Sequence, residues 1–184
     1  MTLIFLILFV LGSFIFKTQF LIFSLFFLTL FLFMYDKYHK KSLFLSFGIS
    51  LVWTIFSVDI YNYSFSFKVF ELFDIFPFLS FGIGLYASYY IFYRILDILN
   101  FRSLHFRLEF LIYCIFYVSL LLFGEWLFYH YVGVQNLATV TYPPLAICNC
   151  FHGPIAMAGI YMMMGPLFFI LNTNLLAYSH KDKA

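Results

Sequence analysis

Apolar residues fill long continuous stretches of this chain, and polar residues gather in the short segments between them. The apolar stretches cover residues 3–16, 20–34, 43–60, 69–93, 108–131 and 153–175. They do not alternate as barrel strands do, and a bilayer core needs about 20 apolar residues in a helix. The pattern therefore predicts an all-α polytopic membrane protein, a bundle of about six transmembrane helices within a single domain over residues 1–184.

The first two stretches are short for a bilayer core, and they predict a tight hairpin of short helices in a locally thinned membrane. The first stretch has no basic segment before it and no small-residue cleavage site after it, and Lys17 follows it. These features favour a retained span over a signal peptide.

Composition strengthens the membrane prediction and excludes some classes of partner. Hydrophobic residues make up 65% of the chain and charged residues 10%, whereas soluble domains carry about 25% charged residues. The bilayer is therefore the expected partner. A net charge of +2, without a basic run or a glycine-rich phosphate loop, predicts no nucleic acid partner and no bound cofactor. The 26% of aromatic residues fits either lipid-facing side chains or an aromatic-lined cavity.

Basic residues are distributed unequally between the two sides of the predicted bundle. If the sides alternate from the N-terminus, one side holds eight of the ten Lys and Arg, namely Lys37, Lys40, Lys41, Arg94, Arg102, Arg107, Lys181 and Lys183. The other side holds Lys17 and Lys68. The positive-inside rule then predicts a cell-membrane protein with both termini in the cytoplasm. An odd number of spans would break this asymmetry.

Two groups of residues in stretch 69–93 predict how this helix is placed. Small residues recur every fourth position and predict a face for close helix contact, at Ser80, Gly84 and Ser88. Four tyrosines lie near the cytoplasmic end and are typical of the interfacial belt, namely Tyr86, Tyr89, Tyr90 and Tyr93.

Polar groups with catalytic potential fall mostly on the outer side, and Glu125 is the most informative. It lies within the apolar run 121–128. A carboxyl group there is costly unless it faces the bundle interior or a cavity, where it can act as a proton donor. The alternative is that Glu125 reaches headgroup water from the outer end of its helix.

Four further residues complete the candidate catalytic set around Glu125. Glu71 and Asp74 lie at the start of the fourth span, where acids are also favoured simply by the helix dipole. His130 and His152 flank the segment between the last two spans. An outward-facing cleft lined by Glu125, His130, Glu71, Asp74 and His152 is the functional hypothesis, and helix caps are the structural alternative.

The segment Cys148–His152 offers soft metal ligands, which suit copper(I) or zinc. The spacing of Cys148, Cys150 and His152 matches no standard zinc pattern, so two unpaired cysteines beside the membrane are the favoured interpretation. The preceding loop 132–149 is mostly apolar, and we expect it to lie on the membrane surface or to fold back over the bundle as a lid.

Residues 125–154 combine a helical acid, Gly133, Tyr142-Pro143-Pro144-Leu145 and a proline-led last span. In order and rough spacing this resembles small membrane proteins of carotenoid biosynthesis, the lycopene-cyclase-domain and carotenoid-hydratase-like groups. The resemblance covers about 30 residues, and the second acidic motif after a proline that is typical of the cyclase domain is absent. It implies that Glu125 protonates a polyene double bond, with aromatic faces such as Trp126 and Tyr129 stabilising the carbocation.

Three functions are compatible with these patterns. The first is a membrane-embedded enzyme or binder that handles a hydrophobic, for example isoprenoid, substrate. The second is a non-enzymatic accessory or assembly subunit that binds another membrane protein. The third is a proton-coupled transporter, because intramembrane acids also couple proton movement.

Overall fold

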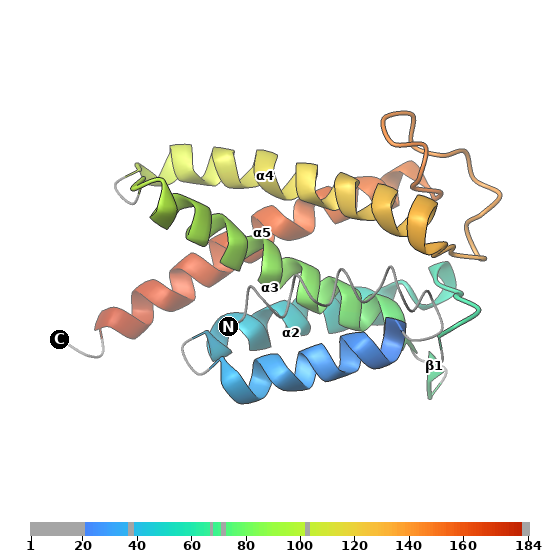
Figure 1. Cartoon of the computed structure of the whole chain (residues 1–184), viewed down its shortest axis with the longest axis horizontal. Coiled ribbons are helices and arrows are strands. Elements are labelled where there is room, and N and C mark those ends of the chain that lie inside the picture. Colours follow the sequence, from blue (N-terminus) through green and yellow to red (C-terminus); the bar gives the residue numbers. More distant parts are fainter. Residues whose placement is uncertain (1–20, 37–38, 67, 71–72, 102–103, 182–184) are drawn as a thin grey trace.

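The structure is a computed structural model that describes residues 21–36, 39–66, 68–70, 73–101 and 104–181 of the chain. In these residues the fold is mostly helical (Figure 1). The main helices are Leu21–Tyr35, α2 Lys40–Phe56, α3 Ile75–Ile98, α4 Phe106–Leu127 and α5 Ile155–Lys181. The π-helical turn η2, Phe128–Val132, extends α4 directly. The prediction of a helical protein is confirmed.

Among the described residues, three helices are long and apolar enough to cross a membrane, over Ile75–Ile98, Phe106–Val132 and Ile155–Asn174. Leu21–Tyr35 is a shorter apolar helix, and α2 has 17 residues. These lengths support a transmembrane protein. The span predicted at residues 3–16 lies outside the described residues.

The bundle has two unlike ends, which lie on opposite sides of Figure 1. We name the end where the described residues of 57–74 and 133–154 lie the loop end, and the end where Asp36, His39, 99–101 and 104–105 lie the hairpin end. Long irregular segments therefore lie together at the loop end, whereas few described residues lie between the helices at the hairpin end. α5 runs across the bundle and diverges from α4 toward its C-terminal half (Figure 1).

Helix α3 begins later than its apolar pattern predicts, at Ile75 instead of residue 69. The residues before it form a two-strand ribbon in which β1, Lys68–Val69, pairs antiparallel with β2, Phe73–Asp74. Asp74 has extended backbone angles, and its carboxylate accepts a hydrogen bond from the backbone N–H of Phe76. This N-cap satisfies a free N–H of the first helical turn and sets the start of α3.

Two apolar clusters share α3. One contains the helix Leu21–Tyr35, α2 and one face of α3, and the other contains the opposite face of α3 together with α4 and α5. Within α4, Tyr113 and Tyr117 are the described residues that are buried, while large apolar side chains such as Leu111, Ile115 and Phe123 are exposed. A helix with so much exposed apolar surface fits a lipid environment.

The closest helix contacts form at glycines that the small-residue pattern did not identify. A Cβ added to Gly82 would lie 2.6 Å from the ring of Phe47 on α2, and one added to Gly165 would lie 2.3 Å from the ring of Tyr117. Gly84 is exposed, with nothing near its Cβ position, so the predicted close contact is wrong at Gly84, whereas Ser88 is buried with its hydroxyl 3.1 Å from that of Tyr113 on α4. The Phe47 ring selects Gly82, which lies on a different face of the helix.

Candidate functional site

A small pocket of about 40 Å³ lies at the loop end, where α4, α5 and both long segments meet. By volume it holds about three water molecules. Glu125 comes from the last turns of α4 and Tyr161 from α5. The full lining comprises Tyr63, Glu125, Tyr129, Val134, Gln135, Asn136, Thr139, Val140, Cys150, Phe151, His152, Met157 and Tyr161.

The backbone around Glu125 departs from a regular helix. Glu125 is half-buried, and the π-helical turn Phe128–Val132 begins three residues later. Gly133 ends this turn with a left-handed φ of 79°, which glycine adopts without strain. The widened turn re-aims the side chains after Leu127, and it places Tyr129 in the wall of the pocket.

Tyrosine hydroxyls form a buried polar network beside the pocket. The hydroxyls of Tyr61 and Tyr161 bond each other, and the indole N–H of Trp53 donates to Tyr61 over 2.7 Å. The hydroxyl of Tyr117 donates to the carbonyl of Tyr161 over 3.0 Å. Burial raises the pKa of Tyr61, so its phenol stays protonated near neutral pH and can donate a hydrogen bond.

Sequence reasoning did not identify this tyrosine network. Tyr61 and Tyr161 are 100 residues apart, and tyrosines at the ends of apolar stretches are typical of the interface with headgroups. The one available signal was a hydroxyl-bearing ring at position 161 within an otherwise apolar, methionine-rich run.

The structure brings together two of the five predicted catalytic residues. Glu125 and His152 both line the pocket, and the Nδ1 atom of His152 lies 2.8 Å from the carbonyl oxygen of Tyr142. His130 is exposed, and its Nε2 atom lies 3.4 Å from the carbonyl oxygen of Cys148. Glu71 lies outside the described residues.

Asp74 has a structural position as the N-cap of α3. It is 2% exposed, and its carboxylate also accepts a hydrogen bond from the hydroxyl of Ser66. Burial raises its pKa despite these hydrogen bonds and the charge of Lys68, which lies opposite it in the β ribbon. Asp74 is not among the residues that line the loop-end pocket.

The segment 133–154 folds back over the bundle. The backbone N–H of Leu137 donates to the carbonyl of Asn62 over 2.8 Å. The side chain of Asn136 donates to the carbonyl of Ile60 over 2.7 Å and accepts from the N–H of Asn62 over 2.9 Å. Segment 133–154 therefore closes the pocket as a lid, one of the two arrangements expected for it.

Cys148 and Cys150 form a disulfide, so the expectation of two unpaired cysteines is wrong. The reason is a local turn: Asn149 adopts a left-handed φ of 50°, which brings the cysteine side chains on either side of it together. Sulfurs joined to each other are not the thiolates that a metal requires. Among the described residues, no group of three or more His, Cys, Asp or Glu side chains is arranged to hold a metal ion.

A second and much larger cavity, of about 670 Å³, lies at the hairpin end. Its walls come from α3, the beginnings of α2 and α4, and Thr173 of α5. Ten of its twelve lining residues carry a polar side-chain group, and the lining residues are His39, Ser42, Tyr86, Tyr89, Tyr90, Tyr93, Arg94, Leu96, Asp97, Phe101, Glu109 and Thr173.

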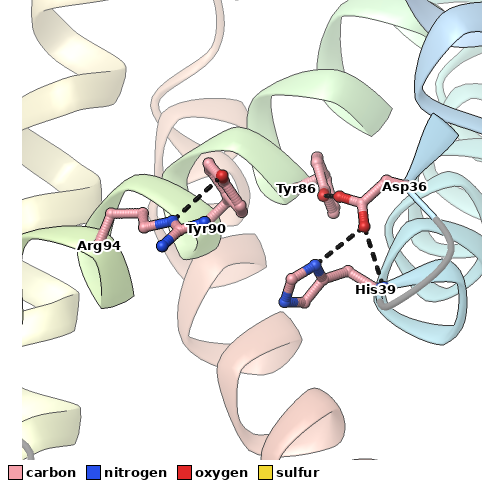
Figure 2. A network of polar contacts seen from close by, with 5 residues as sticks. All are labelled: Asp36, His39, Tyr86, Tyr90 and Arg94. Atoms are coloured by element: carbon pink, nitrogen blue, oxygen red, sulfur yellow. Dashed lines mark hydrogen bonds and ion pairs between the residues drawn. The ribbon is translucent and has the colours of Figure 1, made fainter. Parts of the chain in front are cut away.

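Figure 2 shows the polar network on one wall of this cavity. The hydroxyl of Tyr86 donates to Asp36, and the ring of His39 forms an ion pair with Asp36 over 3.0 Å. Arg94 donates from Nε to the hydroxyl of Tyr90 over 3.1 Å, with its guanidinium carbon 5.3 Å from the centre of that ring. Burial of Asp36 opposes ionisation, but the hydrogen bonds from Tyr86 and His39 and the charge of His39 hold its pKa below the usual range.

The tyrosines of this wall were predicted to belong to the interfacial belt, and for three of them that prediction is wrong. Tyr86, Tyr89 and Tyr90 are 1%, 7% and 8% exposed, so their rings point into the protein. From a sequence alone, a tyrosine near a helix end in the interfacial belt cannot be told apart from a tyrosine on a buried helix face. Asp36 and His39, three residues apart where one helix ends and the next begins, were the overlooked signal.

Ser42 gives this cavity an unsatisfied polar group. Its side chain is fully buried and lines the cavity, and its hydroxyl has no hydrogen-bond partner among the described residues. Buried hydroxyls are normally paired with protein or with a bound molecule.

Comparisons with protein-family models, curated proteins and solved structures find no match to this chain.

Proposed function

We propose that this chain is a six-span cell-membrane protein with both termini in the cytoplasm and its loop end outside. The distribution of charge supports this orientation. Lys40, Lys41, Arg94 and Arg107 all lie near the hairpin end, while Lys68 lies at the loop end. Basic residues favour the cytoplasmic side. The Cys148–Cys150 disulfide at the loop end also fits an oxidising compartment.

Labelling of cysteines in intact cells tests this orientation. After treatment with a membrane-impermeant reductant, an impermeant maleimide should modify Cys148 from outside. A Cys148→Ala, Cys150→Ala chain is the control, because its remaining Cys114 lies within α4. Labelling that requires permeabilised cells would reverse the orientation.

Within this membrane protein, the hairpin-end cavity binds an amphiphilic lipid whose polar head enters the protein. The observation that carries this proposal is the cavity volume, because 670 Å³ lies in the range of small-molecule sites whereas 40 Å³ does not. At this end of a transmembrane bundle the cavity lies at headgroup depth, so an apolar tail can extend along the exposed faces of the helices.

The lining matches a zwitterionic head. Arg94 can face a phosphate, and Glu109 and Asp97 can face an ammonium group. The four tyrosine rings supply aromatic faces of the kind that bind organic cations. Ser42 lies at the cavity wall with a buried, unpaired hydroxyl, and rotation of its side chain would turn this hydroxyl toward a bound head. A phosphatidylethanolamine-type head presents all of these complementary groups.

The binding test compares two buried hydroxyls at opposite ends of the bundle. Delipidated protein is titrated with a short-chain phosphatidylethanolamine, and its affinity is measured by calorimetry. Ser42→Ala should weaken binding about 2- to 10-fold, because one hydrogen bond is worth about 0.5–1.5 kcal/mol.

Thr139→Val is the matched control for Ser42→Ala. Thr139 is also buried and its hydroxyl has no partner among the described residues, but it lines the loop-end pocket. Its substitution should leave the affinity unchanged. Equal weakening by both variants, or no measurable binding to the unmodified protein, would contradict the proposal.

A second candidate function is acid catalysis on a hydrophobic substrate at the loop end, with Glu125 as the proton donor. The observation that favours it is that Glu125 and His152 face one pocket closed by segment 133–154. Because the pocket is small, one end of a polyene would enter it while the remainder lies against the exposed apolar face of α4. The carotenoid-type resemblance of residues 125–154 is compatible with this chemistry.

Product analysis tests the second function. Lycopene in mixed micelles is incubated with the purified chain, and hydrated or cyclised products are separated by chromatography. Glu125→Gln should abolish product formation, because an amide cannot supply the proton. Glu109→Gln, at the opposite end of α4, should retain it. Full activity in Glu125→Gln would exclude this role.

A further inference from the structure

The Cys148–Cys150 disulfide lies at the tip of a small hairpin in segment 133–154. The backbone N–H of Leu145 donates to the carbonyl of Phe151 over 2.9 Å, and Pro144 and His152 form an antiparallel bridge. The N–H groups of Cys148 and Asn149 both donate to the carbonyl of Leu145. The turn that carries the disulfide is therefore already held by backbone hydrogen bonds.

At this position the disulfide contributes little to the stability of the fold. A disulfide stabilises mainly by restricting the unfolded chain, and the effect grows with the length of the loop that it closes. Cys148 and Cys150 enclose one residue, which is nearly the shortest loop possible. Stabilisation of the fold does not account for this bond.

The two sulfurs differ in access. Cys150 is 2% exposed and lines the loop-end pocket, whereas Cys148 is half-exposed and follows Ile147, which is 78% exposed. Exchange requires an incoming thiolate to reach one sulfur while the other leaves. Cys148 is the accessible sulfur, and Ile147 provides an apolar contact beside it.

Two groups that can exchange protons line the same pocket as the leaving sulfur. The pocket that Cys150 lines also contains Glu125 and His152. A thiolate released from Cys150 into this pocket can take up a proton there. The pocket thus supplies the acid that thiol–disulfide exchange needs on the buried side of the bond.

We propose that Cys148–Cys150 is a redox-active disulfide that exchanges with a dithiol of a protein or peptide on the loop-end side. A partner thiolate attacks Sγ of Cys148, the bond to Cys150 breaks, and Sγ of Cys150 keeps the electron pair and takes a proton. The second partner thiolate then attacks the partner sulfur of this mixed disulfide and releases Cys148. The partner loses two electrons and the chain gains them as two thiols. This inference does not depend on the lipid or acid functions proposed above.

Glutathione exchange on the full chain in nanodiscs tests the proposal, in a Cys114→Ala background so that adducts report on the pair. Reduced glutathione should open the disulfide at millimolar concentration, as measured by alkylation and mass spectrometry. With oxidised glutathione, the Cys150→Ser chain should form the mixed disulfide at Cys148 at least ten times faster than the Cys148→Ser chain forms it at Cys150, because Cys150 is buried.

A Cys148→Ala, Cys150→Ala chain separates redox activity from a structural role. Its melting temperature should match that of the unmodified chain. A disulfide that resists millimolar glutathione, equal adduct rates in the two single variants, or a large loss of stability in the double variant would each overturn the proposal.

Discussion

The loop end and the hairpin end each bury an aspartate, and the two carboxylates behave in opposite ways. At the hairpin end Asp36 accepts hydrogen bonds from Tyr86 and His39, and its pKa is lowered. At the loop end Asp74 caps α3 and accepts a bond from Ser66, and its pKa is raised. The difference lies in the balance with burial. The hydrogen bonds from Tyr86 and His39 outweigh the burial of Asp36, whereas the bonds that Asp74 accepts and the charge of Lys68, its partner in the β ribbon, do not outweigh the burial of Asp74.

The cavities at the two ends also differ, above all in volume. The hairpin end keeps a volume of about 670 Å³ among charged and hydroxyl-bearing residues, and the loop end is closed to about 40 Å³ by segment 133–154. A network such as that of Asp36, His39 and Tyr86 can line a polar space between helices because its members satisfy one another, whereas Ser42 in the same cavity is left without a partner. The loop end has a single helical acid in its pocket, Glu125, and closes over it. The lipid binding and the acid chemistry that we propose therefore belong to opposite ends.

Replacement of the two aspartates should show the difference between the two ends most strongly. Asp36→Asn should lower the free energy of unfolding at pH 7 by about 2–3 kcal/mol, because the ionised acceptor of two hydrogen bonds is lost. Asp74→Asn should cost under about 1 kcal/mol, since asparagine also caps helices. Thermal or denaturant unfolding in detergent measures both, and Asp59→Asn at an exposed site is the control.

The pH dependence of these variants has opposite signs. The stabilising contribution of Asp36 is complete above the ordinary value of 3.8 and is lost as the pH falls through its lowered folded pKa. The contribution of Asp74 is complete below 3.8 and is lost as the pH rises through its raised folded pKa. Asp36→Asn should therefore flatten the acid limb of the stability profile, and Asp74→Asn should steepen it. Slope changes of the same sign would contradict this assignment.

A smaller effect is expected from the contact between α4 and α5, where Gly165 packs against the ring of Tyr117. Gly165→Ala should lower stability by about 2 kcal/mol, because its Cβ would meet the Tyr117 ring and force α5 away from α4. Gly159→Ala on the same helix has open space and should change stability by less than about 0.5 kcal/mol, or raise it slightly. Equal stability in the two variants would show that the α4–α5 contact tolerates a methyl group.

The boundaries of the helices show how far an apolar pattern can be read. Hydrophobic runs located α2, α3, α4 and α5 because burial in lipid and in the bundle both require apolar side chains. The pattern placed the start of α3 six residues early, because a β ribbon and a capping aspartate precede it. Composition alone does not distinguish an apolar ribbon from the first turn of a helix.

The candidate site likewise combines residues that the sequence identified with contacts that only the structure shows. Glu125 was identifiable because a carboxylate within an apolar run is rare, and His152 because it opens the last span. Their shared pocket required the contacts of Asn136 with Ile60 and Asn62, which connect segments over 70 residues apart. The pairing of Cys148 with Cys150 depended on the left-handed backbone of Asn149.

The sequence by itself determined that this is a helical membrane protein, which charges lie at which end, and that Glu125 is its most unusual acid. These properties follow from composition and order along the chain, because solvation by lipid acts on each segment separately. The tertiary structure decided which tyrosines are buried, where the large cavity lies, that the two cysteines are joined, and that the pKa values of Asp36 and Asp74 shift in opposite directions. Those properties depend on partners brought from distant positions, because hydrogen bonds, packing and burial are set by neighbours in space.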